Sequence, residues 1–184
     1  MGYNVKMSSE ATHTKTYKKL VEGTTINTQT LLSTDYLNHF NELIMMLEMV
    51  PDMPDMFEEA KSWIPKTYQE HFKDSVFTHK DLAIFAYEHS PQEYRIPLDE
   101  TIVTLNAKIK EGLSKLEILI EHGEADLLRI ESTSLSLHFQ ELMDRASAII
   151  NGVEVEEMET GEIIHDDEAE ANVMGQNAID DMFD

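Results

Sequence analysis

The sequence predicts an all-α protein, a helical bundle built on one long antiparallel helical hairpin. Apolar residues recur at steps of three and four over two long stretches, a spacing that places them along one face of a helix. Only a few residues around Gly123 separate the two stretches, so the connection has room for nothing but an antiparallel turn. No segment shows the sustained apolar–polar alternation that is typical of strands.

The two helices of the hairpin are expected at about 98–122 and 125–150. Gly123 ends the first helix, and Asn151-Gly152 is a typical C-terminal stop for the second. The apolar positions are Leu98, Ile102, Leu105, Ile109, Leu113, Leu116 and Ile120 in the first helix, and Leu128, Leu135, Phe139, Leu142, Ala146 and Ile149 in the second.

A further helix is expected from near Thr28 to Pro51, again from the helical spacing of its apolar residues. Residues 54–97 are expected to form short helices and turns, one of them opened by a capping pattern of Thr78 and Asp81. Pro91 and Pro97 are expected to interrupt the chain before the hairpin begins.

A lone hairpin would leave much of its apolar surface in water. It must therefore pack on the helix at 28–50 or pair with a second hairpin in a dimeric four-helix bundle. We expect the homodimer, because residues 51–97 look too irregular to cover the whole hairpin.

Composition divides the chain into four segments. Residues 1–27, rich in Ser, Thr, Lys and Asn, predict a flexible N-terminal arm, and residues 28–152 form the bundle domain. Residues 153–174 are acidic and have no aromatic residue, so we expect a disordered spacer that is extended by self-repulsion. Residues 175–184, called the tail peptide below, are expected to form a short helix on a partner.

Charge narrows the class of partner. The net charge is −22, and residues 153–184 hold twelve Asp or Glu with no Lys or Arg. Binding to nucleic acid or to anionic lipid requires basic groups that neutralise phosphates, so neither is expected as a partner. The chain has no apolar run of membrane-spanning length and no apolar signal core, and its lack of cysteine suits a reducing compartment, so we expect a cytoplasmic protein.

The tail peptide carries a small apolar stripe. On a helix, Ile179, Met182 and Phe183 share one face while Asp180 and Asp181 point elsewhere. A helix of two turns is unstable alone, so it would fold on a partner with an apolar groove rimmed by Lys or Arg. The alternative is a solubilising acidic tail whose last apolar residues are incidental or dock on the protein's own body.

The tail peptide "GQNAIDDMFD" resembles the peptide by which the flagellar switch protein FliM and the chemotaxis phosphatase CheZ bind the response regulator CheY. Gly175 stands where that peptide usually has Ser, and methionine replaces leucine near the end. The matching positions are Gln176, Ile179, Asp180, Met182 and Phe183.

The order of parts is also similar to that of the CheZ family, in which a long hairpin that dimerises is followed by a linker and then this peptide. The segment "FQELMDR", residues 139–145, resembles the family's active segment, with Glu141 at the Asp position and Arg145 at the Gln position. Arginine has only hydrogen-bond donors and cannot accept a proton from the attacking water, so phosphatase activity is left open. The resemblance implies a chemotaxis or flagellar protein that binds a phosphorylated CheY-like receiver. It implies no cofactor of the protein's own, with Mg²⁺ expected on the receiver.

A second interpretation is a metal-binding or ligand-sensing bundle with an unrelated acidic tail. His39 with Glu42, and His138 with Glu141, are each spaced so that a helix presents both side chains on one face. Helical bundles house metal sites built from such groups. In each unit the intervening Phe is expected in the core, so the His and the acid are expected to flank it on a wetted face.

Overall fold

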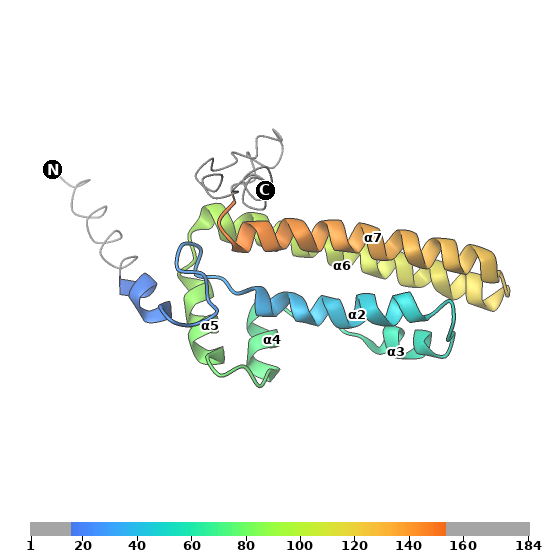
Figure 1. Cartoon of the computed structure of the whole chain (residues 1–184), viewed down its shortest axis with the longest axis horizontal. Coiled ribbons are helices and arrows are strands. Elements are labelled where there is room, and N and C mark those ends of the chain that lie inside the picture. Colours follow the sequence, from blue (N-terminus) through green and yellow to red (C-terminus); the bar gives the residue numbers. More distant parts are fainter. Residues whose placement is uncertain (1–15, 154–184) are drawn as a thin grey trace, which may run out of the picture.

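The computed structural model describes residues 16–153, which form helices and connecting loops with no strand among them (Figure 1). This confirms the predicted all-α bundle. The predicted spacer and tail peptide, like residues 1–15, lie outside the described part. The elements are η1 (Thr34–Leu37), α2 (Asn38–Met49), α3 (Met56–Ser62), α4 (Tyr68–Asp74), α5 (Lys80–Glu88), α6 (Gln92–Glu121) and α7 (Ala125–Ile150). In residues 16–153 no helix is both long and apolar enough to cross a membrane.

Helices α6 and α7 run antiparallel and pack along their whole length (Figure 1). Gly123, at φ +69°, makes the turn between them, and Gly152, at φ +96°, follows the end of α7. Both glycines adopt the left-handed conformation that other residues disfavour. Gly112 lets the two helices approach closely, because a Cβ atom there would lie 2.9 Å from both methyl carbons of Leu135.

Helix α6 begins at Gln92, earlier than expected, and Pro97 lies inside it. The predicted break at Pro97 is therefore wrong. A proline in the second turn removes one backbone hydrogen bond, and packing can offset that loss. Tyr94 and Leu98, on either side of Pro97, are both buried and hold the helix against the core.

A second layer covers the hairpin from one side. Figure 1 shows α2 lying along α7, and α3 contacts both α2 and α6. Phe40, Leu43 and Leu47 of α2 are buried in the same core as the hairpin stripes. The packing on the helix at 28–50, which the sequence allowed as one of two arrangements, is thus present within the chain.

Residues 28–33 are not helical, so the helix predicted from Thr28 begins instead at η1 and α2. The backbone here folds on itself: the Asn27 side-chain oxygen accepts hydrogen bonds from two nearby amides, and Leu31 adopts φ 62° with its side chain fully buried. The Thr30 hydroxyl donates to the Ile150 carbonyl oxygen at 2.6 Å, and the Ser90 hydroxyl donates to the Thr30 carbonyl oxygen at 2.7 Å. These contacts tie the segment to the open end of the hairpin, where α6 begins and α7 ends, and they replace the hydrogen bonds of a helix.

The N-terminal arm was predicted too long. Residues 16–21 are helical, and Val21 and Ile26 are buried in the core. Two apolar side chains within a polar stretch suffice to anchor residues 16–27 to the bundle.

The helix cap predicted from Thr78 and Asp81 is also wrong. Helix α5 is preceded by His79, which makes no side-chain cap hydrogen bond. A capping box forms instead before α4, where Thr67 and Glu70 bond to each other's backbone amides.

Candidate functional site

Glu141 and Arg145 lie one turn apart on α7, on the side that faces away from α2. Glu141 is exposed, and its Oε2 atom lies 3.5 Å from Nδ1 of His138, an ion pair only when the histidine is protonated. Arg145 borders a hollow of about 280 Å³ together with residues of α6. Within residues 16–153 no hydrogen bond or ion pair engages the Arg145 guanidinium. Both groups are therefore available to a second molecule.

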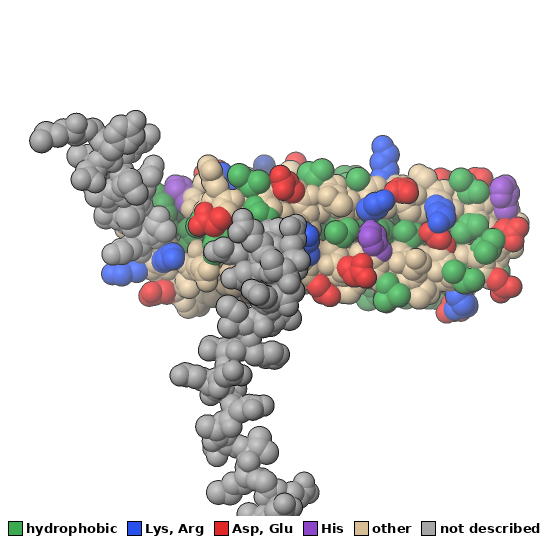
Figure 2. Space-filling view, turned by 90° about the horizontal axis from the view of Figure 1, so that it is seen from above, with side chains coloured by type: hydrophobic (Ala, Val, Ile, Leu, Met, Phe, Trp, Pro, Cys, Tyr) green, Lys and Arg blue, Asp and Glu red, His purple; other side chains and the backbone are tan. Residues whose placement is uncertain are grey.

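The surrounding surface of the hairpin is mixed. Figure 2 looks onto it and shows apolar side chains scattered among acidic, basic and histidine side chains. Large apolar residues exposed on the outer side of the two helices include Ile118 of α6 and Leu127 and Ile130 of α7. Val103 and Leu137 are also exposed, but they line hollows towards α4 and α2. The outer side combines charge with apolar contact area, as protein-binding surfaces do.

The predicted partner-binding residues of the tail peptide lie outside the described residues. They are Gln176, Ile179, Asp180, Met182 and Phe183. Of the residues predicted for receiver binding and catalysis, only Glu141 and Arg145 belong to the described part of the chain, and they lie close together on α7.

His39 is buried, so its predicted place on a wetted face is wrong. Its ring stacks on Trp63 with 4.6 Å between ring centres, and its Nε2 atom lies 2.9 Å from the Ile64 carbonyl oxygen. The Trp63 indole N–H in turn donates to the His39 carbonyl oxygen at 3.0 Å. The segment after α3 folds over this histidine, which a pattern within α2 alone cannot indicate. The expectation for the two intervening phenylalanines is confirmed, since Phe40 and Phe139 are fully buried.

The four residues of the alternative metal site are not assembled by the fold. His39 and Glu42 belong to α2, whereas His138 and Glu141 belong to α7. Within the described part of the chain, no three His, Asp or Glu side chains gather in a group that could hold a metal ion.

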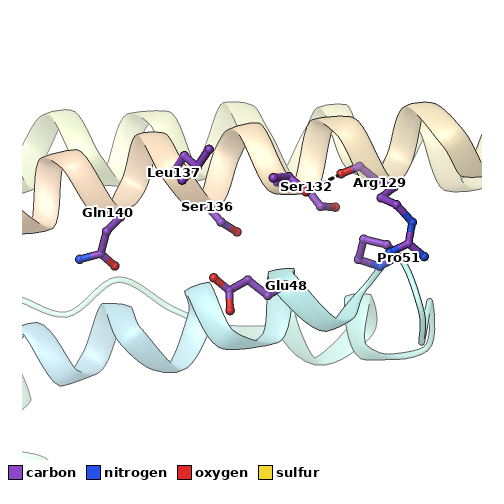
Figure 3. A pocket seen from close by; sticks show the side chains of 8 residues that line it. Glu48, Pro51, Arg129, Ser132, Ser136, Leu137 and Gln140 are labelled. Carbon is purple, nitrogen blue, oxygen red and sulfur yellow. Dashed lines mark hydrogen bonds between the residues drawn. The ribbon is translucent and has the colours of Figure 1, made fainter.

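A cavity of about 350 Å³ lies between α2 and α7, and is called the α2–α7 cavity below (Figure 3). It is lined by Glu48 and Pro51 on one side and by Arg129, Ser132, Thr133, Ser136, Leu137 and Gln140 on the other. Ser132 and Ser136 are only 1% and 6% exposed. Their hydroxyl oxygens have no hydrogen-bond partner among the described residues.

An ion pair borders one end of the α2–α7 cavity, where Arg129 is a lining residue. The Arg129 guanidinium binds the Asp52 carboxylate at 2.5 Å, and this hydrogen bond lowers the pKa of Asp52. The opposite wall carries Glu48, whose side chain is directed towards the serine side of the cavity in Figure 3. The cavity was not predicted, although the sequence carries one signal of it: Ser132 and Ser136 replace apolar residues within the buried stripe of α7.

Comparisons of the chain with protein-family models, with curated proteins and with solved structures returned no match. The case for a function therefore rests on the residues themselves.

Proposed function

We propose that this protein binds the phosphorylated form of a CheY-like response regulator, in chemotaxis or flagellar signalling, through its tail peptide. One observation carries the proposal: residues 175–184 present the side chains of a receiver-binding peptide at matching spacing. Ile179, Met182 and Phe183 would fill an apolar groove, while Asp180 would face its basic rim.

The described residues build a hydrophobic core of their own, which suits a chain whose tail peptide would act on a partner. Large side chains of this core, among them Phe40, Phe72 and Phe139, are fully buried.

The length of the spacer suits a tethered partner. Residues 154–174 can span at most about 70 Å when fully extended. Helix α7, at 26 residues, is about 39 Å long. A receiver held by the tail peptide can therefore also touch any part of α7. Such a tether raises the local concentration of the receiver at the hairpin.

On the hairpin, Glu141 and Arg145 are the groups that we propose meet the bound receiver. Glu141 can accept a hydrogen bond from a lysine of the receiver, and Arg145 can stabilise phosphoryl charge. Neither group replaces the glutamine that orients water in the CheZ family. The proposal is therefore a receiver-binding protein first, with a phosphatase role resting on these two residues. It requires no cofactor in this chain, and the Mg²⁺ belongs to the receiver.

The test is a titration of a CheY-like receiver, activated with beryllofluoride, into the full chain. We expect the double substitution Ile179→Ala and Phe183→Ala to weaken binding at least about tenfold, or about 1.4 kcal/mol, because it removes two apolar anchors. The matched control is Ile163→Ala with Ile164→Ala, an aliphatic pair in the acidic spacer, which should leave binding unchanged. Equal losses in both double variants, or no loss in either, would contradict the proposal.

A further inference from the structure

We propose that the α2–α7 cavity binds a small aliphatic primary ammonium ion, with Glu48 as its counter-ion and the Ser132 and Ser136 hydroxyls as hydrogen-bond partners. This inference goes beyond receiver binding and does not depend on it. It assigns a ligand class to a site that lies between two helices, apart from Glu141 and Arg145.

Two buried serine hydroxyls in the cavity call for hydrogen-bond partners. Both side chains are more than nine-tenths buried, both line the cavity, and neither hydroxyl has a partner in residues 16–153 (Figure 3). Buried polar groups are normally hydrogen-bonded, because leaving one unpaired is costly. Larger apolar residues at these two positions would fill the space between α2 and α7. The serines therefore leave the cavity open and give its wall two hydroxyl groups.

The charged residues of the lining favour a positively charged ligand. Within the described residues Glu48 makes no hydrogen bond or ion pair, and Arg129, the other charged residue of the lining, is already paired with Asp52. Glu48 also lies in the last turn of α2, where the helix dipole adds negative potential and no basic side chain offsets it. The net charge of −22 acts in the same direction. The cavity therefore favours a cation.

The polar groups of the lining suit an ammonium ion better than a metal ion. Calcium takes six to eight oxygen ligands and usually several carboxylates, whereas the lining of this cavity has a single unpaired carboxylate, that of Glu48. An ammonium group has three N–H donors. These match one carboxylate and two hydroxyl oxygens.

The volume of the cavity and its apolar residues limit the size and character of the remainder of the ligand. The volume of about 350 Å³ lies at the small end of ligand-binding pockets. Pro51 and Leu137 offer apolar surface for a short alkyl chain, and Gln140 can bond a second polar group. A short aliphatic amine meets these conditions.

The experiment is a titration of n-butylammonium chloride into the full chain at neutral pH without any receiver, with n-butanol as an uncharged analogue of the same length. We expect saturable binding of one ammonium ion per chain and none of the alcohol. Glu48→Gln should weaken the binding at least tenfold. Glu42→Gln removes an equally exposed acid of the same helix that does not line the cavity, and it should leave the binding unchanged.

A second variant separates the cavity from general surface charge. Ser136→Leu should fill the cavity and abolish binding while Glu48 stays in place. Comparable binding by wild type, Glu48→Gln and Ser136→Leu would overturn the proposal, since it would indicate attraction to the acidic surface only. The absence of saturable binding to wild type would overturn it too, and would mean that the cavity holds water only.

Discussion

His39 and His71 are two titratable side chains whose charged forms the fold disfavours. Burial lowers the pKa of both rings, and the nearby cation of Lys66 lowers each further. The Ile64 carbonyl and the Glu42 carboxylate act in the opposite direction on His39 without reversing the shift. The two ring centres lie 5.9 Å apart, and charge on His71 lowers the pKa of His39 further.

These histidines predict a loss of stability in mild acid. As the pH falls below about 6.5, histidines in the unfolded chain take up protons while His39 and His71 resist, so the unfolded state binds more protons. The free energy of unfolding should then fall by at most about 1.4 kcal/mol per pH unit for each histidine, until the lowered pKa is reached. The measurement is urea unfolding at pH 7 and pH 5.5.

The matched variant for this prediction is His39→Gln, whose amide can still donate to the Ile64 carbonyl oxygen but does not titrate. Its stability should depend less on pH than that of wild type. Asp99, whose pKa burial raises, opposes the effect in both proteins alike and cancels in the comparison. Equal pH dependence in the two proteins would show that His39 is not held neutral.

At the level of the element, the long helices were the most predictable part of the fold. The apolar repeat of α7 and its glycine stop are local signals, and the observed helix, Ala125–Ile150, agrees with the expected 125–150. The helix predicted to start near Thr28 does not include residues 28–33, because their structure depends on distant contacts. Thr30 bonds to Ser90, 60 residues away in the chain, and to Ile150, 120 residues away. Local periodicity carries no information about such contacts.

The same distinction applies to the candidate sites. The helical spacing of Glu141 and Arg145 placed them on one side of α7, and no tertiary knowledge was needed. The α2–α7 cavity depends on which helix lies against Ser132 and Ser136, and the burial of His39 depends on Trp63 from another element. Sites formed between two elements therefore could not be predicted from the sequence and became visible only in the structure.

The close contact of α6 with α7 yields a test at this scale. Gly112→Leu should destabilise the fold by roughly 2 kcal/mol, because the added side chain must displace Leu135 and Phe139 from a packed interface. Ala107→Leu, at an exposed position of the same helix, is the control and should change stability little. Thermal unfolding measures both variants. Equal melting temperatures would mean that the two helices do not meet closely at Gly112.

For the whole molecule, the reason given for expecting a dimer, an uncovered hairpin, holds only in part. The hairpin is covered on one side by α2 and α3 of the same chain, despite the irregular sequence between 51 and 97. The outer side keeps exposed apolar residues near the hairpin turn: Ile118, Leu127 and Ile130 are 52%, 50% and 65% exposed. We propose that self-association buries this patch. Because Leu127 and Ile130 lie near the start of α7 and Glu141 lies nearer its end, Glu141 would stay accessible in such a dimer.

This patch predicts a homodimer that a single charge disrupts. Ile130→Glu should shift the protein from dimer to monomer, since it places a carboxylate in an apolar interface. Val103→Glu, an equally exposed position far from the hairpin turn, should leave the mass unchanged. Sedimentation equilibrium at micromolar protein concentration measures the mass. A monomeric wild-type protein under these conditions would contradict the dimer.

The central claim is that the bundle and the tail peptide have separate roles, folding for one and receiver binding for the other. The most direct test is calorimetric titration of a beryllofluoride-activated CheY-like receiver into the full chain and into a chain truncated after Met174. We predict binding by the full chain that weakens as salt rises, because Asp180 and Asp181 face a basic rim, and a loss of at least about tenfold on truncation. Equal affinity of the two chains for the activated receiver would contradict the account.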